Sequence, residues 1–225
     1  MTCSIIGVDD FGNNIINKFI KFEKSRYKIL DYEQRLDRIQ FIKTIEDTDG
    51  IKLNKKIWDK ELKPLIIIIG EQDNSISKQI KLEYEKNEYV CIIEIYTQNV
   101  KSNNIKFITK DINKIINLIS VIIFQYGNID YDWGYVIQEE KIIDKNIKIY
   151  KLQGNMQEIE QQIKLLQIKE GVCITNIFGG NTINNYTCKR INEMILKQTT
   201  HKKHNIYKLN NCNIENIEVI IVNIS

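Results

Sequence analysis

Residues 124–136 read Phe-Gln-Tyr-Gly-Asn-Ile-Asp-Tyr-Asp-Trp-Gly-Tyr-Val. This run carries two acids, Asp130 and Asp132, one residue apart, and it follows the most regular apolar pattern in the chain. Between Asp111 and Phe124, isoleucine recurs at helical spacing, at Ile112, Ile115, Ile116, Ile119, Ile122 and Ile123. The spacing predicts an α-helix, and its apolar character indicates a helix that is buried on more than one side.

The composition is that of a globular protein with a hydrophobic core. The chain has 225 residues, 43% of them hydrophobic and 27% charged, which is enough for one large domain or two small ones. The net charge of +3 is too weak and too interspersed to indicate nucleic acid as a partner. The longest apolar run, Leu65–Ile69, is too short for membrane insertion. The N-terminus shows no signal peptide, so we expect a cytoplasmic protein.

The first half of the chain alternates between strand-like and helix-like segments. Leu65–Gly70 is a continuous apolar run of the kind found inside parallel sheets. The other expected strands are Cys3–Val8, Tyr27–Leu30 and Val90–Tyr96. We expect a helix around residues 15–20, another over residues 75–87, and a mixture of helix and loop over residues 34–63. This alternation predicts a doubly wound α/β domain with a Rossmann-like parallel sheet.

A second, smaller α/β unit is expected after the long helix. Its predicted strands are Ile147–Leu152, Val172–Phe178, Asn205–Leu209 and Ile217–Ile224, and its predicted helices are Asn155–Gln167 and Thr182–Lys197. No linker or internal repeat divides the chain, which makes the long helix the natural divider. We therefore expect a first domain over residues 1–125, ending in that central helix, and a second over residues 126–225.

Several segments resemble the tubulin/FtsZ superfamily. Gly171–Gly180 is similar to the family's G-V-L-V-N-I-T-G-G strand and turn, and the run after the long helix is similar to its G-x-I-N-x-D-F-A-D-V. Without gaps, Gly127, Ile129 and Val136 are kept, and Asp132 matches the first acid of that motif. The resemblance implies two domains joined by a central helix, GTP as the ligand, and assembly into filaments.

The phosphate-binding loops of that family are only partly present. Where the family has G-V-G-G-G-G-G-N, Gly7, Gly12 and Asn14 fit and Asn13 lies beside them, but Asp9, Asp10 and Phe11 replace glycines. After Gly70 the glycine-rich second loop is replaced by Glu71–Ser77, in which Ser75 is expected to cap the following helix. Gly7, Gly12, Asn13, Asn14 and Gly70 are therefore the candidate cofactor-binding residues of degenerate loops. The added carboxylates would repel a triphosphate unless a metal intervened.

The acids after the long helix are the candidate catalytic residues. The resemblance implies that such acids reach the nucleotide of the neighbouring subunit, and Asp132 keeps one of them, while Tyr135 replaces the other. Asp130 is an additional acid. Asp130 and Asp132 together could hold a cation, but a solvated acidic turn is the commoner explanation of such a pair. Three aromatic side chains of the run, Tyr131, Trp133 and Tyr135, are candidates for a protein interface.

The remaining chemically active residues point to no further site. His201 and His204, with Cys188 or Cys212, would be the components of a zinc site, but their spacing is not that of zinc ligands. We predict no metal. The five cysteines form no C-x-x-C pair and are expected to be buried free thiols.

Three hypotheses about function follow. The leading one is a shortened, divergent FtsZ-like cytoskeletal protein that is a degenerate GTPase without a cofactor. It would act by contacts with itself or with an FtsZ/tubulin-like filament, as a subunit, co-polymer, cap or scaffold. The second is a polymerising GTPase with an atypical phosphate loop, in which Asp9 and Asp10 hold Mg²⁺ against the phosphates of GTP. The third is an α/β interaction module that is unrelated to this superfamily.

Overall fold

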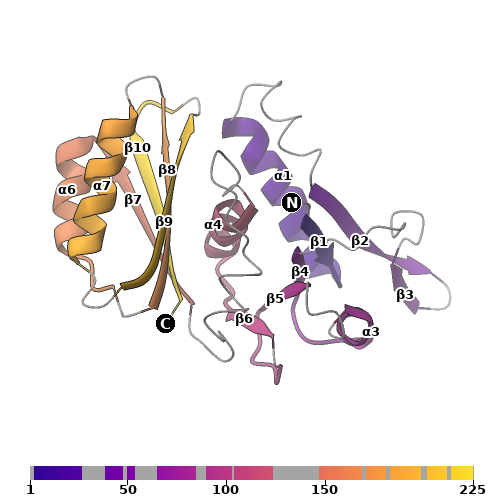
Figure 1. Cartoon of the computed structure of the whole chain (residues 1–225). Helices are drawn as coiled ribbons and strands as arrows, with labels where there is room; N and C mark the ends of the chain where they lie inside the picture. Colours follow the sequence, from indigo (N-terminus) through magenta and orange to yellow (C-terminus); the bar gives the residue numbers. More distant parts are fainter. Residues whose placement is uncertain are drawn as a thin grey trace.

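Two β-sheets lie on either side of one central helix (Figure 1). The computed structural model describes residues 3–26, 39–47, 50–53, 65–84, 90–102, 104–123, 147–168, 171–180, 183–198, 202–211 and 214–224. The central helix is α4 (Ile112–Ile123), which packs against strands of the second sheet and against helix α1 (Asp10–Arg26) of the first domain.

The first sheet has six strands in the order β3-β2-β1-β4-β5-β6. Five of them are mutually parallel, and β3 pairs antiparallel with β2 at one edge. The strands are β1 (Cys3–Gly7), β2 (Ile39–Asp47), β3 (Gly50–Leu53), β4 (Leu65–Gly70), β5 (Cys91–Tyr96) and β6 (Ile105–Ile108). Strand β4 is central and buried along its whole length, as its unbroken apolar sequence predicts.

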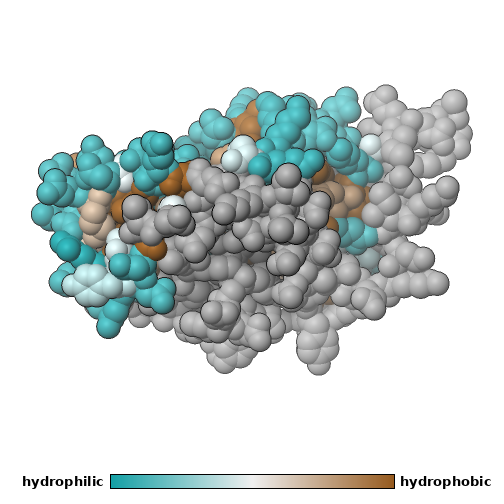
Figure 2. Space-filling view, turned by 90° about the horizontal axis from the view of Figure 1, so that it is seen from above, coloured by the Kyte–Doolittle hydropathy of each residue, from teal (hydrophilic) through white to brown (hydrophobic). Residues whose placement is uncertain are grey.

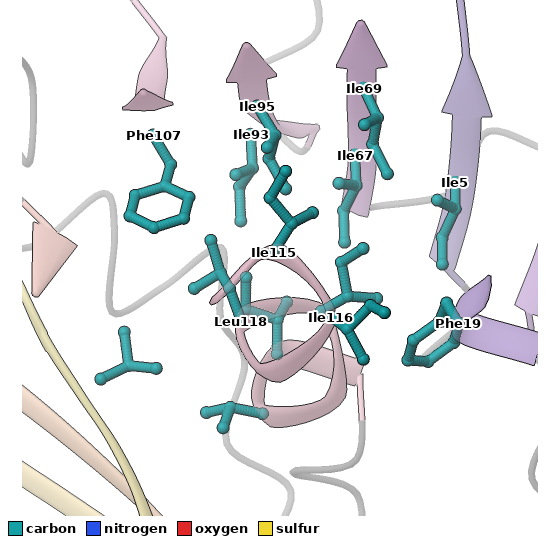
Figure 3. Packing of buried hydrophobic residues seen from close by; sticks show 14 of the residues in the cluster. Ile5, Phe19, Ile67, Ile69, Ile93, Ile95, Phe107, Ile115, Ile116 and Leu118 are labelled. Carbon is teal, nitrogen blue, oxygen red and sulfur yellow. The ribbon is translucent and has the colours of Figure 1, made fainter. Parts of the chain in front are cut away.

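Helices cover both faces of this sheet. Because strand side chains alternate between faces, Ile67 and Ile69 of β4 pack on the side of α1 and α4, whereas Ile66 and Ile68 pack beneath α3 (Ser75–Tyr84). Figure 3 shows residues of α4, among them Ile115, beneath the sheet. The buried hydrophobic residues of α4 are Ile115, Ile116, Leu118, Ile119, Val121 and Ile122, and Asn117 and Ser120 are buried as well, which confirms the prediction of a helix buried on more than one side.

The second sheet has four strands in the order β7-β10-β8-β9. Its strands are β7 (Ile147–Gly154), β8 (Gly171–Gly179), β9 (Lys202–Asn211) and β10 (Ile217–Ile224). Helices α6 (Met156–Lys164) and α7 (Asn185–Lys197) cover its outer face. The inner face presents Ile174, Phe178, Ile220 and Val222 to the core that includes α4.

The structure confirms most of the expected elements and corrects two segments. Residues 39–47 and 50–53 are strands, not the expected helix and loop, and β6 is a strand that was not expected. Strand β2 alternates apolar and polar side chains imperfectly, and β6 has only four residues, so neither gives a strong periodic pattern. The expected strand Tyr27–Leu30 and the boundary at residues 125 and 126 lie outside the described residues.

The described thiols are buried and free, as expected. Cys3, Cys91, Cys173 and Cys188 are all in this state, and Cys212 lies outside the described residues. Burial raises the pKa of Cys173 and of Cys188 to about 11, which disfavours the reactive thiolate at neutral pH.

The described surface is mostly hydrophilic. Seen from above, hydrophobic side chains show through only in small areas (Figure 2). The exposed large hydrophobic residues are Leu82, Ile108, Leu165 and Tyr186. Within the described residues, no helix combines the length and the apolar character that a membrane crossing requires.

Candidate functional site

The topology of the first sheet places a candidate site at the carboxyl ends of β1 and β4. These strands are neighbours, but α1, which follows β1, lies on one face, and α3, which follows β4, lies on the other. Such a switch point is where open α/β sheets bind ligands. Two segments meet there: residues 7–12, from the end of β1 into the first turn of α1, and residues 70–74, from the end of β4 to the start of α3. We call them the switch-point loops.

The carboxylate of Asp9 joins the two switch-point loops. Its Oδ1 accepts a hydrogen bond from the backbone N–H of Gly12 at 2.9 Å, and its Oδ2 accepts one from the N–H of Glu71 at 2.7 Å. The first bond caps the N-terminus of α1, where backbone N–H groups and the helix dipole favour an anion. The second bond reaches across to the loop that follows β4. One side chain therefore uses two backbone donors from segments far apart in sequence.

The predicted glycines lie at this junction, where they make room for protein atoms. A Cβ on Gly12 would lie 2.0 Å from the carbonyl oxygen of Ile69, and one on Gly7 would lie 2.7 Å from the backbone nitrogen of Asn13. A Cβ on Gly70 would lie 2.8 Å from Oδ2 of Asp9. At Gly7 and Gly12 the nearest atoms include backbone, so the close approach of β1, α1 and β4 explains these two glycines. At Gly70 the nearest atoms belong to the side chains of Val8 and Asp9.

The two predicted asparagines differ in their surroundings. The Asn13 amide donates to the carbonyl oxygen and to Oγ1 of Thr44, both at 3.1 Å, and its Oδ1 accepts from the Thr44 N–H at 3.2 Å. Asn13 thereby fastens α1 to β2. Asn14 is exposed on α1. The structure thus brings Gly7, Gly12, Asn13 and Gly70 together.

Helix α3 is capped by Asn74, and the prediction that Ser75 caps it is wrong. The Asn74 Oδ1 accepts hydrogen bonds from the N–H groups of Ile76 and Ser77, each at 3.0 Å. Its side-chain amide also donates to the Val8 carbonyl at 2.7 Å, which makes a second bridge between the switch-point loops. Sequence reasoning missed Asn74, although Asn is as good an N-cap as Ser and stands one residue earlier.

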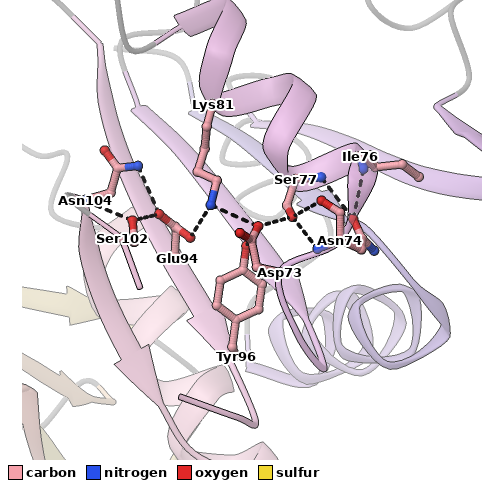
Figure 4. A network of polar contacts seen from close by, with 9 residues as sticks. All are labelled: Asp73, Asn74, Ile76, Ser77, Lys81, Glu94, Tyr96, Ser102 and Asn104. Atoms are coloured by element: carbon pink, nitrogen blue, oxygen red, sulfur yellow. Dashed lines mark hydrogen bonds and ion pairs between the residues drawn. The ribbon is translucent and has the colours of Figure 1, made fainter. Parts of the chain in front are cut away.

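A buried ionic network that the sequence did not predict lies behind the second loop (Figure 4). The Lys81 Nζ is 2.9 Å from Oδ1 of Asp73 and 3.2 Å from Oε2 of Glu94, whose side chain is fully buried. Glu94 also accepts hydrogen bonds from Ser102 and, at 2.9 Å, from Asn104. Together these contacts connect α3 to β5 and to the segment after β5.

The network shifts the pKa values of Asp73 and Lys81. Burial acts to raise the pKa of Asp73, but hydrogen bonds from Ser77 and Lys81 outweigh it and hold the pKa below its usual value. Burial likewise acts to lower the pKa of Lys81, and its bond to Asp73 and the charge of Glu94 outweigh that effect and raise the pKa. Each group is therefore held in its charged form.

The residues of the switch-point loops do not fit GTP with Mg²⁺. The donors of Gly12 and Glu71, which a phosphate would use, are held by Asp9. Both oxygens of Asp9 already accept one hydrogen bond each from the protein backbone. The loops also carry Asp10, Glu71 and Asp73. A negative unit charge about 4 Å from any one of these carboxylates would be repelled by roughly 4 kcal/mol at an effective dielectric of about 20.

The other predicted site residues lie outside the described part of the chain. This applies to the candidate catalytic acids Asp130 and Asp132 and to the candidate interface residues Tyr131, Trp133 and Tyr135. It also applies to His201 and to the side chain of His204. Among the described residues, no three His, Cys, Asp or Glu side chains are grouped so that they could hold a metal ion.

Comparison with known proteins identifies the fold. By sequence, the chain matches no family model and no curated protein. By structure, it is similar to GDP-bound monomeric CetZ1 from Haloferax volcanii, with a TM-score of 0.62, 10% identity, and coverage of 99% of this chain and 93% of that one. CetZ from Methanosaeta thermophila gives a TM-score of 0.59 at 11% identity, covering 100% and 86%.

A third solved structure, an empty FtsZ dimer from M. jannaschii, gives a TM-score of 0.54 at 11% identity and covers 100% and 88%. The likeness extends over the whole chain in each case. The chain therefore has the fold of FtsZ and CetZ, at a level of identity that marks it as divergent. This agrees with the fold that the resemblance implied.

Proposed function

We propose that this chain is an FtsZ-like assembly protein that acts through protein–protein contacts and does not turn over GTP. One observation carries the proposal: two backbone N–H groups, one of Gly12 and one of Glu71, donate to the carboxylate of Asp9 of the chain itself. A nucleotide would have to displace that carboxylate and approach the neighbouring acids. The fold of FtsZ and CetZ is retained, and side chains of Asp9 and Asn74 link the two segments at this end of the sheet.

Self-association is the contact that the fold supports best. One FtsZ structure of this fold is an empty dimer, so two copies of that protein associate in an empty state. In the present chain, Tyr131, Trp133 and Tyr135 are proposed to contact a second copy or an FtsZ/tubulin-like filament. Aromatic residues are enriched among the side chains that contribute most to such interfaces.

Light scattering and sedimentation of the purified protein, with and without GTP and Mg²⁺, test the proposal. We expect concentration-dependent assembly that is the same in both conditions, and no phosphate release. Replacing Trp133 by alanine should weaken assembly. Replacing Tyr186, an exposed aromatic on α7, by alanine is the matched control and should leave assembly unchanged.

Two outcomes would overturn the proposal. GTP turnover that rises with protein concentration and is lost on replacing Asp132 by asparagine would identify an active polymerising GTPase. Saturable GTP binding that strictly requires a divalent ion would favour the second hypothesis, in which Asp9 and Asp10 hold a metal against the phosphates. Absence of binding at millimolar GTP with Mg²⁺ would exclude that hypothesis.

A further inference from the structure

We propose that the Asp9 carboxylate acts as a resident anion that takes the place of a bound phosphate and joins the switch-point loops without any ligand. The inference deepens the proposed function and rests on it, because it explains how the loops stay assembled in a protein that needs no nucleotide. Asp9 is a positioning residue in this account. It acts on α1 and on the loop after β4 through their backbones.

The geometry at Asp9 is that of an anion held by protein donors. Its two oxygens separately accept the N–H of Gly12 at 2.9 Å and the N–H of Glu71 at 2.7 Å. One donor belongs to the first turn of α1, where the helix dipole stabilises negative charge. The other belongs to a different loop, so the carboxylate does more than an ordinary N-cap, which bonds only within its own helix.

The packing around the carboxylate shows that this position is part of the close-packed junction. Gly70 lies so near that a Cβ there would come within 2.8 Å of Oδ2 of Asp9. The Asn74 amide, which donates to the Val8 carbonyl at 2.7 Å, holds the same two loops together from the α3 side. The loops thus meet through one carboxylate and one amide, and only the carboxylate occupies backbone N–H donors of both loops.

Removing the carboxylate should therefore free two donors that a small oxyanion can bridge. The variant to use is D9G, because glycine is nearly as good as aspartate at a helix N-cap and keeps the helix start intact. The probe is inorganic phosphate, added at constant ionic strength against sodium chloride. The matched control is D10N, which removes one negative charge from the exposed neighbour at the same helix end but leaves the bridge in place.

Thermal unfolding with increasing phosphate is the measurement. We expect the midpoint of D9G to rise by about 2–4 °C more than that of the wild type, which corresponds to about 1 kcal/mol for a protein of this size. The wild type and D10N should show only the small general effect of phosphate on protein stability. Equal phosphate responses in D9G, D10N and the wild type would overturn the inference, and so would the absence of any response in D9G.

A second variant keeps the test decisive if D9G does not fold. D9S retains an N-cap hydroxyl for Gly12 but is too short to bridge to Glu71, so it frees the second donor alone. Its phosphate response should exceed that of D10N, and an equal response would again overturn the inference. The readout is stability, and it is separate from assembly. GTP turnover by the wild type would remove the proposed function, whereas a missing phosphate response without turnover would remove only the role of Asp9.

Discussion

Replacing Lys81 by methionine is expected to destabilise the first domain strongly. The Lys81 ammonium group lies 2.9 Å from Asp73 and 3.2 Å from Glu94, and the Glu94 side chain is fully buried. Methionine has similar length and fills the same space, but it carries no charge. The substitution therefore removes the cation and leaves the Glu94 carboxylate buried with only neutral hydrogen-bond donors.

The magnitude follows from that isolated charge. Removing one partner of a buried ion pair costs about 3–5 kcal/mol, because the remaining charge is uncompensated. Loss of the Asp73 contact adds little, since the Asp73 side chain is 17% exposed and partly screened by solvent. At roughly 2–4 °C for each kcal/mol in a protein of this size, the unfolding midpoint should fall by about 6–20 °C.

Chemical denaturation and thermal unfolding of four proteins provide the assay. K78M is the matched control, because Lys78 is an exposed lysine of the same helix. E94Q should be milder than K81M, at about 1–2 kcal/mol, since it removes the buried charge and leaves Lys81 paired with Asp73. The double variant K81M/E94Q should be more stable than K81M by about 1–3 kcal/mol, because no unpaired charge remains.

Either of two results would refute this reasoning. If K81M were within about 1 kcal/mol of K78M, the network would not hold the charge of Glu94 as the distances imply. If the effects of K81M and E94Q simply added, within about 0.5 kcal/mol, the two side chains would not be energetically coupled. In both cases the contacts between α3 and β5 would owe their stability to apolar packing alone.

Three further predictions follow from the same structure. The pKa of Asp73 lies below its usual value, so the stability that this carboxylate contributes is present above about pH 4 and is lost as the pH falls through the lower folded-state pKa. Between pH 6 and pH 2, the free energy of unfolding of D73N should therefore fall less steeply than that of the wild type. Replacing Gly154 by alanine should lower the stability measured by urea unfolding by about 1–3 kcal/mol, because the φ of Gly154 is +147° and a Cβ would lie 2.3 Å from Oε2 of Glu158. A loss of stability smaller than that of the N-cap variant N155A would contradict this prediction. In C212S, no thiol should react rapidly with a disulfide reagent until the protein is denatured, because the other four cysteines are buried and free; a fast-reacting thiol in the native state would contradict this.

The fold was predictable where apolar runs are long. Strand β4 is buried along its whole length and reads as a short continuous apolar run, and the isoleucines of α4 recur at helical spacing. Strand β2 was missed because charged residues such as Lys43 and Asp47 interrupt its alternation near the edge of the sheet. Strand β6 was missed because four residues with two inward side chains, Ile105 and Phe107, are too few to establish a period.

The site was predictable only in part, for a physical reason. The glycines of the switch-point loops could be located because the resemblance to the tubulin/FtsZ phosphate loops marks their positions. The role of Asp9 could not, because it depends on the backbone N–H of Glu71, which is 62 residues away in sequence. The ion pair between Lys81 of α3 and Glu94 of β5 could not be predicted either. Nothing in the sequence of one segment indicates that it meets the other when the sheet forms.

Gly7, Gly12 and Gly70 carry less information about ligands than their spacing suggests. A side chain on Gly12 would collide with the Ile69 carbonyl, at 2.0 Å, whether or not any phosphate were present. The approach of α1 to β1 and β4 therefore requires glycine at this position, with or without a ligand. The residues between the glycines are free of that requirement, so they show what the loop does. One of these residues is Asp9, whose carboxylate accepts hydrogen bonds from both loops. Asp9 is therefore stronger evidence against a nucleotide site than the glycines are for one.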